Sequence, residues 1–283
     1  MADVSHAVLI TGCSSGIGRA TAERLAGAGW NVYATARRPE TIADLAERGC
    51  RTLALDVTDD ASIQAAVKTV EVDEGAVGVL VNNAGYGQEG AIEQVPIDEV
   101  RRQFETNVFG LLGLTQLVLP GMRRQRWGKV VNVSSMGGRV TLPGGGIYHA
   151  SKYAVEALSD ALRFEVKGFG IDVVVIEPGL IRTQFEEAAI ATLEQSSDGD
   201  HPYAAYHEAF ARQLRESYNG PLAKLASTGP DTVARAIERA IGSRHPRTRY
   251  VITPAAKALV QLRRVLPDRV FDAMLRLQVT PPG

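Results

Sequence analysis

Short runs of apolar residues alternate with longer amphipathic stretches through most of this chain of 283 residues. The apolar runs lie at residues 7–10, 32–35, 53–55, 79–81, 130–133, 173–176 and 250–252. Such nearly continuous runs are typical of strands that are covered on both faces of a sheet, whereas the stretches between them have helical spacing. The alternation predicts an α/β fold: a doubly wound, parallel sheet with right-handed crossovers and helices on both faces.

The alternation is interrupted once. Residues 179–230 separate two of the predicted strands, and this is far more chain than such a connection needs. We interpret residues 180–230 as an insertion that covers the substrate as a lid does. Because the sequence contains no internal repeat and no second series of strands and helices, we expect residues 1–283 to form a single domain.

The end of the chain differs in charge from the rest. The formal net charge is -1, yet residues 239–283 contain nine Lys or Arg and only two Asp. Within residues 255–283, apolar side chains recur at helical spacing on both sides of Pro267. This basic amphipathic tail favours a pair of terminal helices that pack on the body or on a second subunit. Weak peripheral contact with a membrane surface is the alternative.

Composition argues against several classes of protein. Two cysteines cannot form a disulfide framework, and no Cys/His spacing predicts a metal site. The near-zero net charge argues against a nucleic-acid partner. No secretory signal is visible at the start, and the longest apolar run, at residues 108–119, is too short to cross a bilayer. We expect a soluble, cytoplasmic protein without a bound metal.

A glycine-rich turn follows the first predicted strand. Its sequence is Thr11-Gly12-Cys13-Ser14-Ser15-Gly16-Ile17-Gly18, and a helical pattern begins within it. The glycines permit a tight turn and a close approach of the backbone to a pyrophosphate, which then faces the N-terminus of the helix. The turn therefore predicts a dinucleotide cofactor.

The end of the second strand indicates which dinucleotide is bound. An enzyme that uses NAD places an acidic residue about 20 residues past the glycines, where it binds the ribose 2′-hydroxyl. This chain has Ala34-Thr35-Ala36-Arg37-Arg38 there, without a carboxylate. The Arg37 guanidinium offers a permanent charge and parallel donors to a 2′-phosphate. We predict NADP(H), with NAD(H) as the alternative.

Three residues are candidates for the chemistry. Tyr148 and Lys152 are four residues apart and share one face of a predicted helix, and Ser135 ends a predicted strand thirteen residues before Tyr148. In a doubly wound sheet, reactive groups gather at the carboxyl ends of the strands, beside the cofactor. His149 is adjacent to Tyr148 but points elsewhere on the helix, so we expect it to pack or to be exposed.

The motifs also occur in a familiar order. They are Thr11-Gly12-x-x-x-Gly16-Ile17-Gly18, Asn82-Asn83-Ala84-Gly85, Asn107, Ser135, Tyr148-x-x-x-Lys152 and Pro178-Gly179-x-x-x-Thr183. Together they resemble the short-chain dehydrogenase/reductase family, in its TGxxxGxG and YxxxK branch, and most of all its hydroxysteroid and retinol dehydrogenase-like subset. The resemblance covers residues 5–183 and implies a Rossmann-type sheet of about seven strands in the order 3-2-1-4-5-6-7.

The resemblance implies catalytic roles for four residues. Tyr148 would be the general acid in carbonyl reduction and the base in alcohol oxidation, since Lys152 and an oxidised nicotinamide would lower its pKa. Lys152 would also bind the ribose hydroxyls. Ser135 would bind the substrate oxygen. Asn107 would hold a water in a proton relay to Lys152.

The resemblance further implies a set of cofactor-binding residues. They are Gly12, Ser14, Ser15, Gly16, Ile17, Gly18, Arg37, Asp56, Val57, Asn83, Ala84, Gly85, Tyr148, Lys152, Pro178, Gly179, Ile181 and Thr183. In the enzymes that it resembles, nicotinamide accepts or donates hydride directly.

The residues expected around the substrate are mostly apolar. The predicted contacts are Ser135, Met136, Leu142, Ile147, Tyr148 and Phe185, with Val140, Tyr203, Tyr206 and Phe210 as further linings. They favour a hydrophobic ketone or aldehyde and its alcohol, of steroid, retinoid or lipid type. We expect the enzyme to be a homodimer or homotetramer that acts on the CH–OH group.

Two other functions stay open at this point. One is a 3-oxoacyl-thioester reductase, which needs a basic docking face for its carrier, and the tail supplies positive charge. The other is a non-enzymatic NADP-binding sensor, which would keep the glycine turn but has no use for Tyr148.

Overall fold

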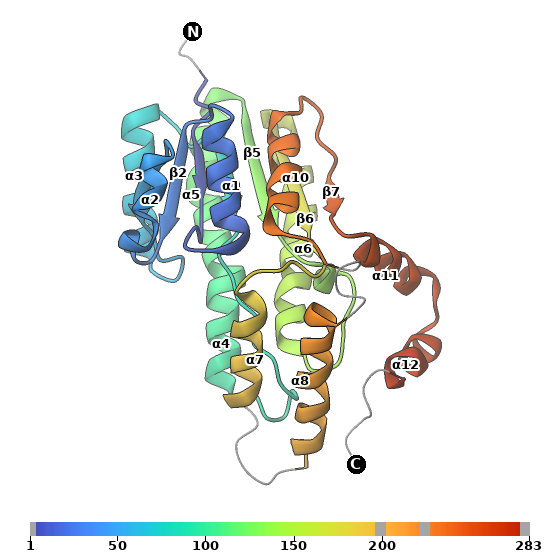
Figure 1. Ribbon diagram of the computed structural model, residues 1–283. Coiled ribbons are helices and arrows are strands. Elements are labelled where there is room, and N and C mark those ends of the chain that lie inside the picture. The colour runs from blue at the N-terminus through green and yellow to red at the C-terminus, as the bar shows by residue number, and fades with distance from the viewer. Residues whose placement is uncertain (1–3, 196–201, 221–226, 278–283) are drawn as a thin grey trace.

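The computed structural model describes residues 4–195, 202–220 and 227–277, and within them one parallel sheet has the strand order β3-β2-β1-β4-β5-β6-β7 (Figure 1). The strands are β1 Val8–Ile10, β2 Val32–Ala36, β3 Arg51–Ala54, β4 Val79–Asn82, β5 Gly128–Val133, β6 Ile171–Glu177 and β7 Arg249–Val251. Val8 of the central strand lies opposite Val32 on one side and Val79 on the other. The predicted fold class and strand order are confirmed.

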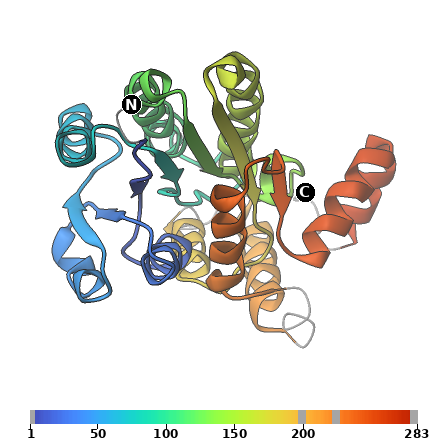
Figure 2. The same cartoon turned by 90° about the horizontal axis from the view of Figure 1, so that it is seen from above.

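Helices cover both faces of this sheet (Figure 2). On one face lie α1 Gly16–Gly27, α2 Asp44–Glu47 and α10 Pro230–Gly242; on the other lie α3 Asp60–Glu74, α5 Gly110–Gln125 and α6 Gly146–Val166. Each face has its own apolar core: the first core lies under α1, α2 and α10, and the second lies under α3, α5 and α6. Val8 packs in the first core, and its neighbour Leu9 packs in the second. Both faces of the strands are therefore apolar, which explains why the runs in the sequence are nearly continuous.

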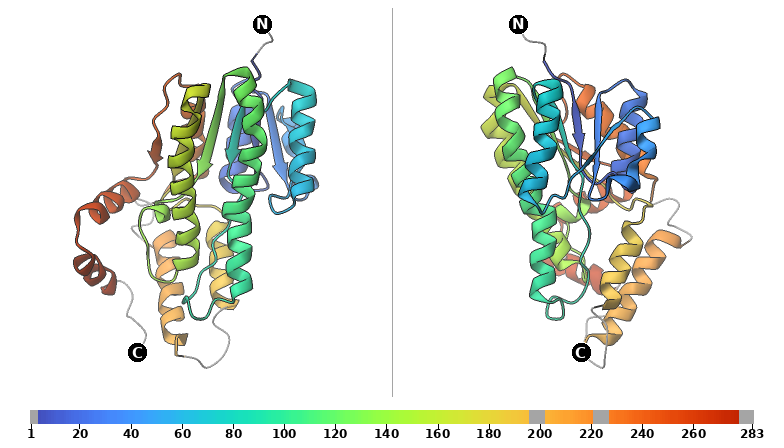
Figure 3. Two further views of the ribbon diagram at one scale, coloured as in Figure 1. Left: turned by 180° about the vertical axis from the view of Figure 1, so that it is seen from behind. Right: turned by 90° about the vertical axis from the view of Figure 1, so that its left-hand side faces the viewer.

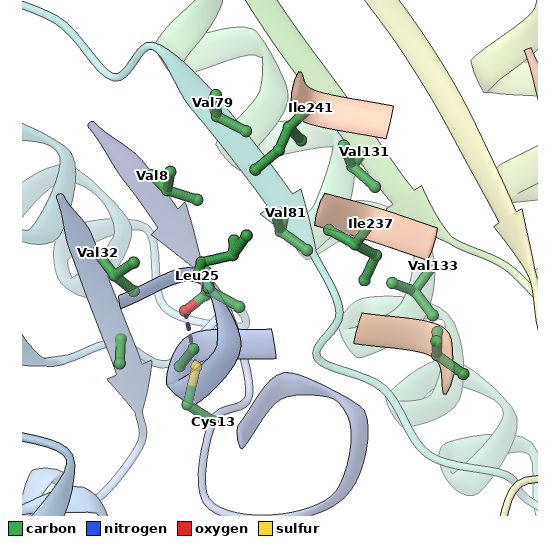
Figure 4. Packing of buried hydrophobic residues seen from close by; sticks show 14 of the residues in the cluster. Val8, Cys13, Leu25, Val32, Val79, Val81, Val131, Val133, Ile237 and Ile241 are labelled. Atoms are coloured by element: carbon green, nitrogen blue, oxygen red, sulfur yellow. Dashed lines mark hydrogen bonds between the residues drawn. The ribbon is translucent and has the colours of Figure 1, made fainter. Parts of the chain in front are cut away.

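The first core is filled mainly by β-branched side chains of the central strands. Val79 and Val81 of β4, with Val131 and Val133 of β5, face Ile237 and Ile241 of α10 (Figure 4). Ile237 is fully buried. Branched side chains suit a strand because they fill the space between pleated neighbours. The core holds the carboxyl ends of β4 and β5 at fixed positions, and the cavity described below lies there.

Two element boundaries differ from the sequence prediction. The third strand was expected at residues 53–55, but β3 is Arg51–Ala54 because its residues pair with Tyr33–Ala36 of β2. The stretch between the fourth and fifth predicted strands, where helical spacing was expected, is not one regular helix: it contains α4 Ile97–Phe104, a π-helical turn at Glu105–Phe109, and α5. A π-helical turn inserts one residue into the helical ladder and often occurs at a functional site.

The remaining helices lie beyond the carboxyl ends of the strands. α7 Phe185–Gln195 and α8 Ala204–Asn219 pack on each other below the sheet, whereas α11 Pro254–Val265 and α12 Asp268–Arg276 lie beside the body (Figure 3). Parts of the expected insertion and tail, residues 196–201, 221–226 and 278–283, lie outside the described residues. In the part of the chain that the structure describes, no helix is both long and apolar enough to cross a membrane.

Candidate active site

A cavity of about 670 Å³ lies at the carboxyl ends of the strands. The glycine turn and the ends of β2 and β4 line one part of it, and the 135–149 region, α7 and α8 line the other. All predicted cofactor-binding residues except Gly18 are on its wall. The structure thus brings together side chains that are up to about 170 residues apart in the sequence.

The glycine turn is shaped by two close approaches of the backbone. Gly12 has a φ of 73°, which favours glycine. A Cβ on Gly18 would lie 2.3 Å from the carbonyl oxygen of Gly12 and 2.5 Å from Nδ2 of Asn83, so a side chain at residue 18 does not fit. Gly18 therefore supports the turn from behind rather than lining the cavity. The N–H groups at the start of α1 face the space in which a pyrophosphate would lie.

Thr11 and Asn83 fix this turn to the next strand. Thr11 Oγ1 accepts hydrogen bonds from the backbone N–H groups of Asn83 (3.0 Å) and Ala84 (2.9 Å). Asn83 Nδ2 in turn donates to the carbonyl oxygens of Thr11 (2.9 Å) and Gly12 (3.1 Å). The turn is therefore preorganised by side chains, and its residues fit a dinucleotide phosphate.

Arg37 and Asp56 lie at the opposite end of the same half of the cavity. The Arg37 side chain is exposed at the end of β2 and lines the cavity. Asp56 Oδ1 accepts from the backbone N–H (2.9 Å) and the hydroxyl (2.8 Å) of Thr58, so it stabilises a turn. The cap of α3 is a different residue, Asp59.

The three candidate catalytic side chains meet on the cavity wall. Ser135 Oγ accepts from the Gly137 backbone N–H (3.0 Å), and the Ser135 hydroxyl lies near enough to that of Tyr148 to act on its pKa. The Lys152 ammonium donates to the Val133 carbonyl oxygen (3.0 Å) and lies 5.8 Å from the centroid of the Tyr148 ring. One turn of α6 separates Tyr148 from Lys152, which is why both reach the same space.

Burial controls the ionisation of this group. It raises the pKa of Tyr148 well above its usual value, although the nearby Ser135 hydroxyl acts in the opposite direction. Burial also lowers the pKa of Lys152 to about 8, against the favourable charge of Glu156. In the protein alone desolvation dominates the pKa of Tyr148; the lowering that the resemblance implies also involves the charge of an oxidised nicotinamide.

Asn107 lies in the π-helical turn, behind the cavity. Its Nδ2 donates to the carbonyl oxygen of Tyr86 (3.0 Å) and to Ser151 Oγ (3.1 Å), and its Oδ1 accepts from the Tyr86 backbone N–H (3.2 Å). A Cβ on Gly85 would lie 2.9 Å from Asn107 Oδ1 and 3.6 Å from Lys152 Nζ. Asn107 therefore holds the loop after β4 and is a near neighbour of Lys152.

The other half of the cavity is largely apolar. Of the predicted substrate contacts, Ser135, Met136, Leu142, Tyr148 and Phe185 line it, and Ile147 does not. Phe210, Leu214 and Tyr218 of α8 also line it. The further candidate linings Val140, Tyr203 and Tyr206 lie off its wall. The Phe185 ring centroid is 5.4 Å from that of Tyr148, so the first residue of α7 packs against this tyrosine.

Sequence reasoning missed two polar residues on this wall. His149 is 7% exposed, and its Nδ1 accepts from the Leu142 backbone N–H (3.2 Å). Burial lowers its pKa to about 4, so the imidazole is neutral at neutral pH. Glu89 is 6% exposed, and burial raises its pKa to about 8. A single acidic residue in a loop has no spacing that distinguishes it from an exposed one, so the sequence held no pattern that would have found Glu89.

Comparison with known proteins places this geometry among related enzymes. A family model described as short chain dehydrogenase matches residues 6–194. The chain is 36% identical over 276 residues to a 3-ketodihydrosphingosine reductase of Bacteroides thetaiotaomicron, covering 95% of this chain and 96% of that protein. It is also 36% identical to an NADPH-dependent 3-dehydrocapnine reductase of Ornithobacterium rhinotracheale, covering 93% and 94% of the two. Identity to the human retinol dehydrogenase 5 is again 36%, with 98% of this chain and 89% of that protein covered.

Proposed function

This chain belongs to the short-chain dehydrogenase/reductase family, and from that premise we propose that it is an NADP(H)-dependent oxidoreductase that interconverts a hydrophobic ketone or aldehyde and its alcohol. The observation that carries the proposal is the meeting of Ser135, Tyr148 and Lys152 on the cavity that the glycine turn also lines. A protein that only binds a nucleotide has no need for a buried proton donor beside it.

The chain's own residues account for the polar part of the reaction. A bound nicotinamide cofactor supplies the hydride. Because Ser135 Oγ already accepts a backbone N–H, its own proton is free to be donated to a substrate carbonyl oxygen. The Tyr148 hydroxyl gives its proton to the same oxygen as negative charge develops there. Lys152 contributes positive charge on the inner side of Tyr148.

Tyr148 is placed to act as a proton donor. Burial raises its pKa in the protein alone, so the hydroxyl keeps its proton at neutral pH. This form suits reduction of a carbonyl, whereas oxidation of an alcohol needs the phenolate, which Lys152 and an oxidised nicotinamide would favour.

The substrate half of the cavity supports a hydrophobic substrate. Leu142, Phe185, Phe210 and Leu214 bury apolar surface there, which stabilises a bound chain or ring by about 25 cal/mol per Å² of apolar surface. The names of two relatives specify a 3-keto or 3-dehydro compound, and that of the third a retinol. A lipid-like or retinoid-like carbonyl compound is the class that we propose.

The residues of α7 and α8 on the cavity wall support a further part of the proposal. Phe185, Ala188 and Ala189 come from α7, and Phe210, Leu214 and Tyr218 from α8. We propose that residues 180–230, within the single domain formed by residues 1–283, cover the substrate. Exposed apolar side chains at Phe109, Leu117 and Phe164 on the outer helices support self-association of the whole chain.

One experiment tests the enzyme proposal. NADPH and NADH oxidation is followed with steroid, retinoid, long-chain and sugar carbonyl compounds, for the wild type, Tyr148→Phe and Tyr153→Phe. Tyr148→Phe should lower kcat/KM by roughly 10²–10⁴-fold while the Kd for NADPH stays nearly constant. Tyr153 is 42% exposed on the same helix, so Tyr153→Phe is the matched control. Full turnover by Tyr148→Phe, or activity confined to sugars, contradicts the proposal.

A second experiment tests the cofactor preference. Arg37 lines the cavity whereas Arg38 does not, although both are exposed. In Arg37→Ala, kcat/KM with NADPH should fall roughly ten- to hundredfold and kcat/KM with NADH should change little, because only NADPH has the 2′-phosphate. Arg38→Ala is the control. A wild-type enzyme with a higher kcat/KM for NADH than for NADPH is the contrary result.

A further inference from the structure

Glu89 introduces a carboxyl group into the apolar half of the cavity. It lies in the loop after β4 and lines the cavity, and its side chain is 94% buried. Among the described residues, no group forms a hydrogen bond with Glu89 Oε2 or an ion pair with Glu89. An unpaired buried carboxyl is costly, so a protein rarely keeps one without a function.

The position of Glu89 is fixed from three sides. Its backbone N–H donates to Thr192 Oγ1 of α7 (3.1 Å). The next backbone N–H, of Gly90, donates to the Gly144 carbonyl oxygen (2.8 Å), and that of Ala91 donates to His207 Nε2 of α8 (3.0 Å). The backbone that carries Glu89 is therefore held by the two helices that line the substrate half and by the loop that precedes α6.

This position is close to the reacting groups. A Cβ on Gly145 would lie 2.9 Å from Glu89 Oε2 and 2.7 Å from His149 Cε1, and Gly145 precedes Tyr148 by three residues. The charge of Glu89 acts on Tyr148 and on Tyr206, and it raises the pKa of each. When the carbonyl oxygen of a substrate binds at Tyr148, the substituents next to that carbonyl group therefore lie on the side of Glu89.

The cations on the cavity wall do not neutralise Glu89. Lys152 donates to the Val133 carbonyl oxygen, and Arg102 pairs with Glu99 (2.9 Å). Arg37 lies at the cofactor end, beside the end of β2. A countercharge that holds Glu89 in its ionised form therefore has to come from a ligand.

We propose that Glu89 binds a substrate ammonium group close to the reacting carbonyl, so that the preferred substrates are apolar amino ketones and the corresponding amino alcohols. This inference rests on the proposed function and adds a determinant of its specificity. An ammonium supplies both the donor for Oε2 and the missing charge. A substrate without a donor leaves Glu89 unpaired in the complex, and sites of this kind discriminate strongly against such analogues.

The first test compares three long-chain ketones of equal length with NADPH: one with an amino group next to the carbonyl, one with a hydroxyl there, and one with neither. The wild type should have a roughly ten- to hundredfold higher kcat/KM for the amino ketone than for the unsubstituted one. In Glu89→Gln this ratio should fall to about one. Glu93→Gln is the control, since Glu93 is exposed in the same loop and accepts from the Tyr203 hydroxyl.

A second readout does not depend on activity. The pKa of Glu89 is about 8, so at pH 7 its carboxyl is largely protonated before an ammonium arrives. Tyr148, His149 and Tyr206, which surround it, are uncharged at this pH because burial shifts the pKa of each toward the neutral form. Calorimetric titration with the amino alcohol in buffers of different ionisation enthalpy should show release of about one proton by the wild type and none by Glu89→Gln.

The outcomes separate this inference from the proposed function. Equal kcat/KM values for the amino and unsubstituted ketones, or a preference for the hydroxy ketone, overturn the role of Glu89 and leave the oxidoreductase proposal standing. Reduction of none of the three with either NADPH or NADH contradicts the proposed function itself. If Glu89→Gln does not fold, the calorimetry of the wild type still decides, because binding without proton release contradicts the inference.

Discussion

Burial shifts the ionisable residues around the cavity toward their uncharged forms. It raises the pKa of Tyr148 and of Glu89, and it lowers the pKa of Lys152 and of His149. The site at rest is therefore a set of mostly neutral donors and acceptors in an apolar enclosure, where each charge that a ligand brings acts strongly.

Glu89 should make the stability of the protein depend on pH. Its folded pKa of about 8 lies above its ordinary value of 4.5, so the folded state holds the proton longer than the unfolded chain does. The stability that depends on this proton is complete below pH 4.5 and is lost as pH rises through about 8. Glu89→Gln removes this loss. Relative to the wild type, Glu89→Gln should gain on the order of 2–4 kcal/mol in the free energy of unfolding between pH 5 and pH 8.

Urea unfolding at the two pH values measures this difference, and the ionisation of His149 cancels because it is common to both proteins. Glu93→Gln, which changes an exposed carboxyl of the same loop, should differ from the wild type by the same amount at both pH values. A Glu89→Gln curve parallel to that of the wild type from pH 5 to pH 8 would show that Glu89 is not desolvated.

Single residues of the site were predictable where a spacing carried the information. Ser135, Tyr148 and Lys152 could be found because one turn of helix and one strand end bring them together. Glu89 could not, because its segment is held by α7 and α8, which begin about a hundred residues further along the chain. The place of His149 on the wall depends on the loop before α6, where Gly137, Leu142 and Gly145 contact the imidazole.

At the scale of elements, the π-helical turn between α4 and α5 connects the outer helix layer to the cavity. It places Asn107 against the Tyr86 backbone, while Gln103 of α4 donates to the same carbonyl oxygen (2.8 Å). The two side chains form a clamp on the loop after β4, which carries both Gly85 and Glu89 on the cavity wall. Gln103 and Asn107 are four residues apart, so both side chains face this loop.

Asn107→Leu should loosen this clamp, because it keeps the branching at Cγ but removes both hydrogen-bonding groups. Gln103 still satisfies the Tyr86 carbonyl, but the Tyr86 backbone N–H loses its acceptor, so we expect a loss of about 1–3 kcal/mol in the free energy of unfolding. KM for the carbonyl substrate should rise, because the 85–89 loop is less well ordered. Glu105→Gln, an exposed change in the same turn, is the control and should stay within about 0.5 kcal/mol of the wild type. Unchanged stability in Asn107→Leu contradicts the clamp.

Most elements followed from the sequence, and the exceptions have physical reasons. Apolar runs predicted the strands because cores on both faces select for apolar residues at every position, as Val8 and Leu9 show. The π-helical turn was not predicted because its residues, Glu105–Phe109, have ordinary helical propensities; the extra residue is accommodated by the contacts of Asn107. β3 was displaced because its exposed residues are not apolar and pairing with β2 alone determines its register.

At the scale of the whole molecule, the two helices of the basic tail pack behind residues that line the cavity. Phe271 of α12 and Val260 of α11 are buried with Val140, and Met136 and Leu142, which line the cavity, pack against the same cluster. Arg263 pairs with Asp268 (2.6 Å) and lies over the Phe271 ring, so part of the tail's positive charge is used within the tail. The helix pair thus backs the loop that leads to Tyr148, which agrees with packing on the body.

The strand order also determines how the chain assembles as it is made. β1 is synthesised first and becomes the centre of the sheet; β2 and β3 then extend one edge, and β4 to β7 extend the other. Each strand after the first therefore finds its neighbour already present, so the sheet can grow outward from the N-terminus during translation. Two strand edges wait long for their partners: Val8 of β1 pairs with Val79, and Val175 of β6 pairs with Arg249. Until each partner emerges, an apolar strand edge is unpaired, and during these two intervals of synthesis the nascent chain is open to association with other chains.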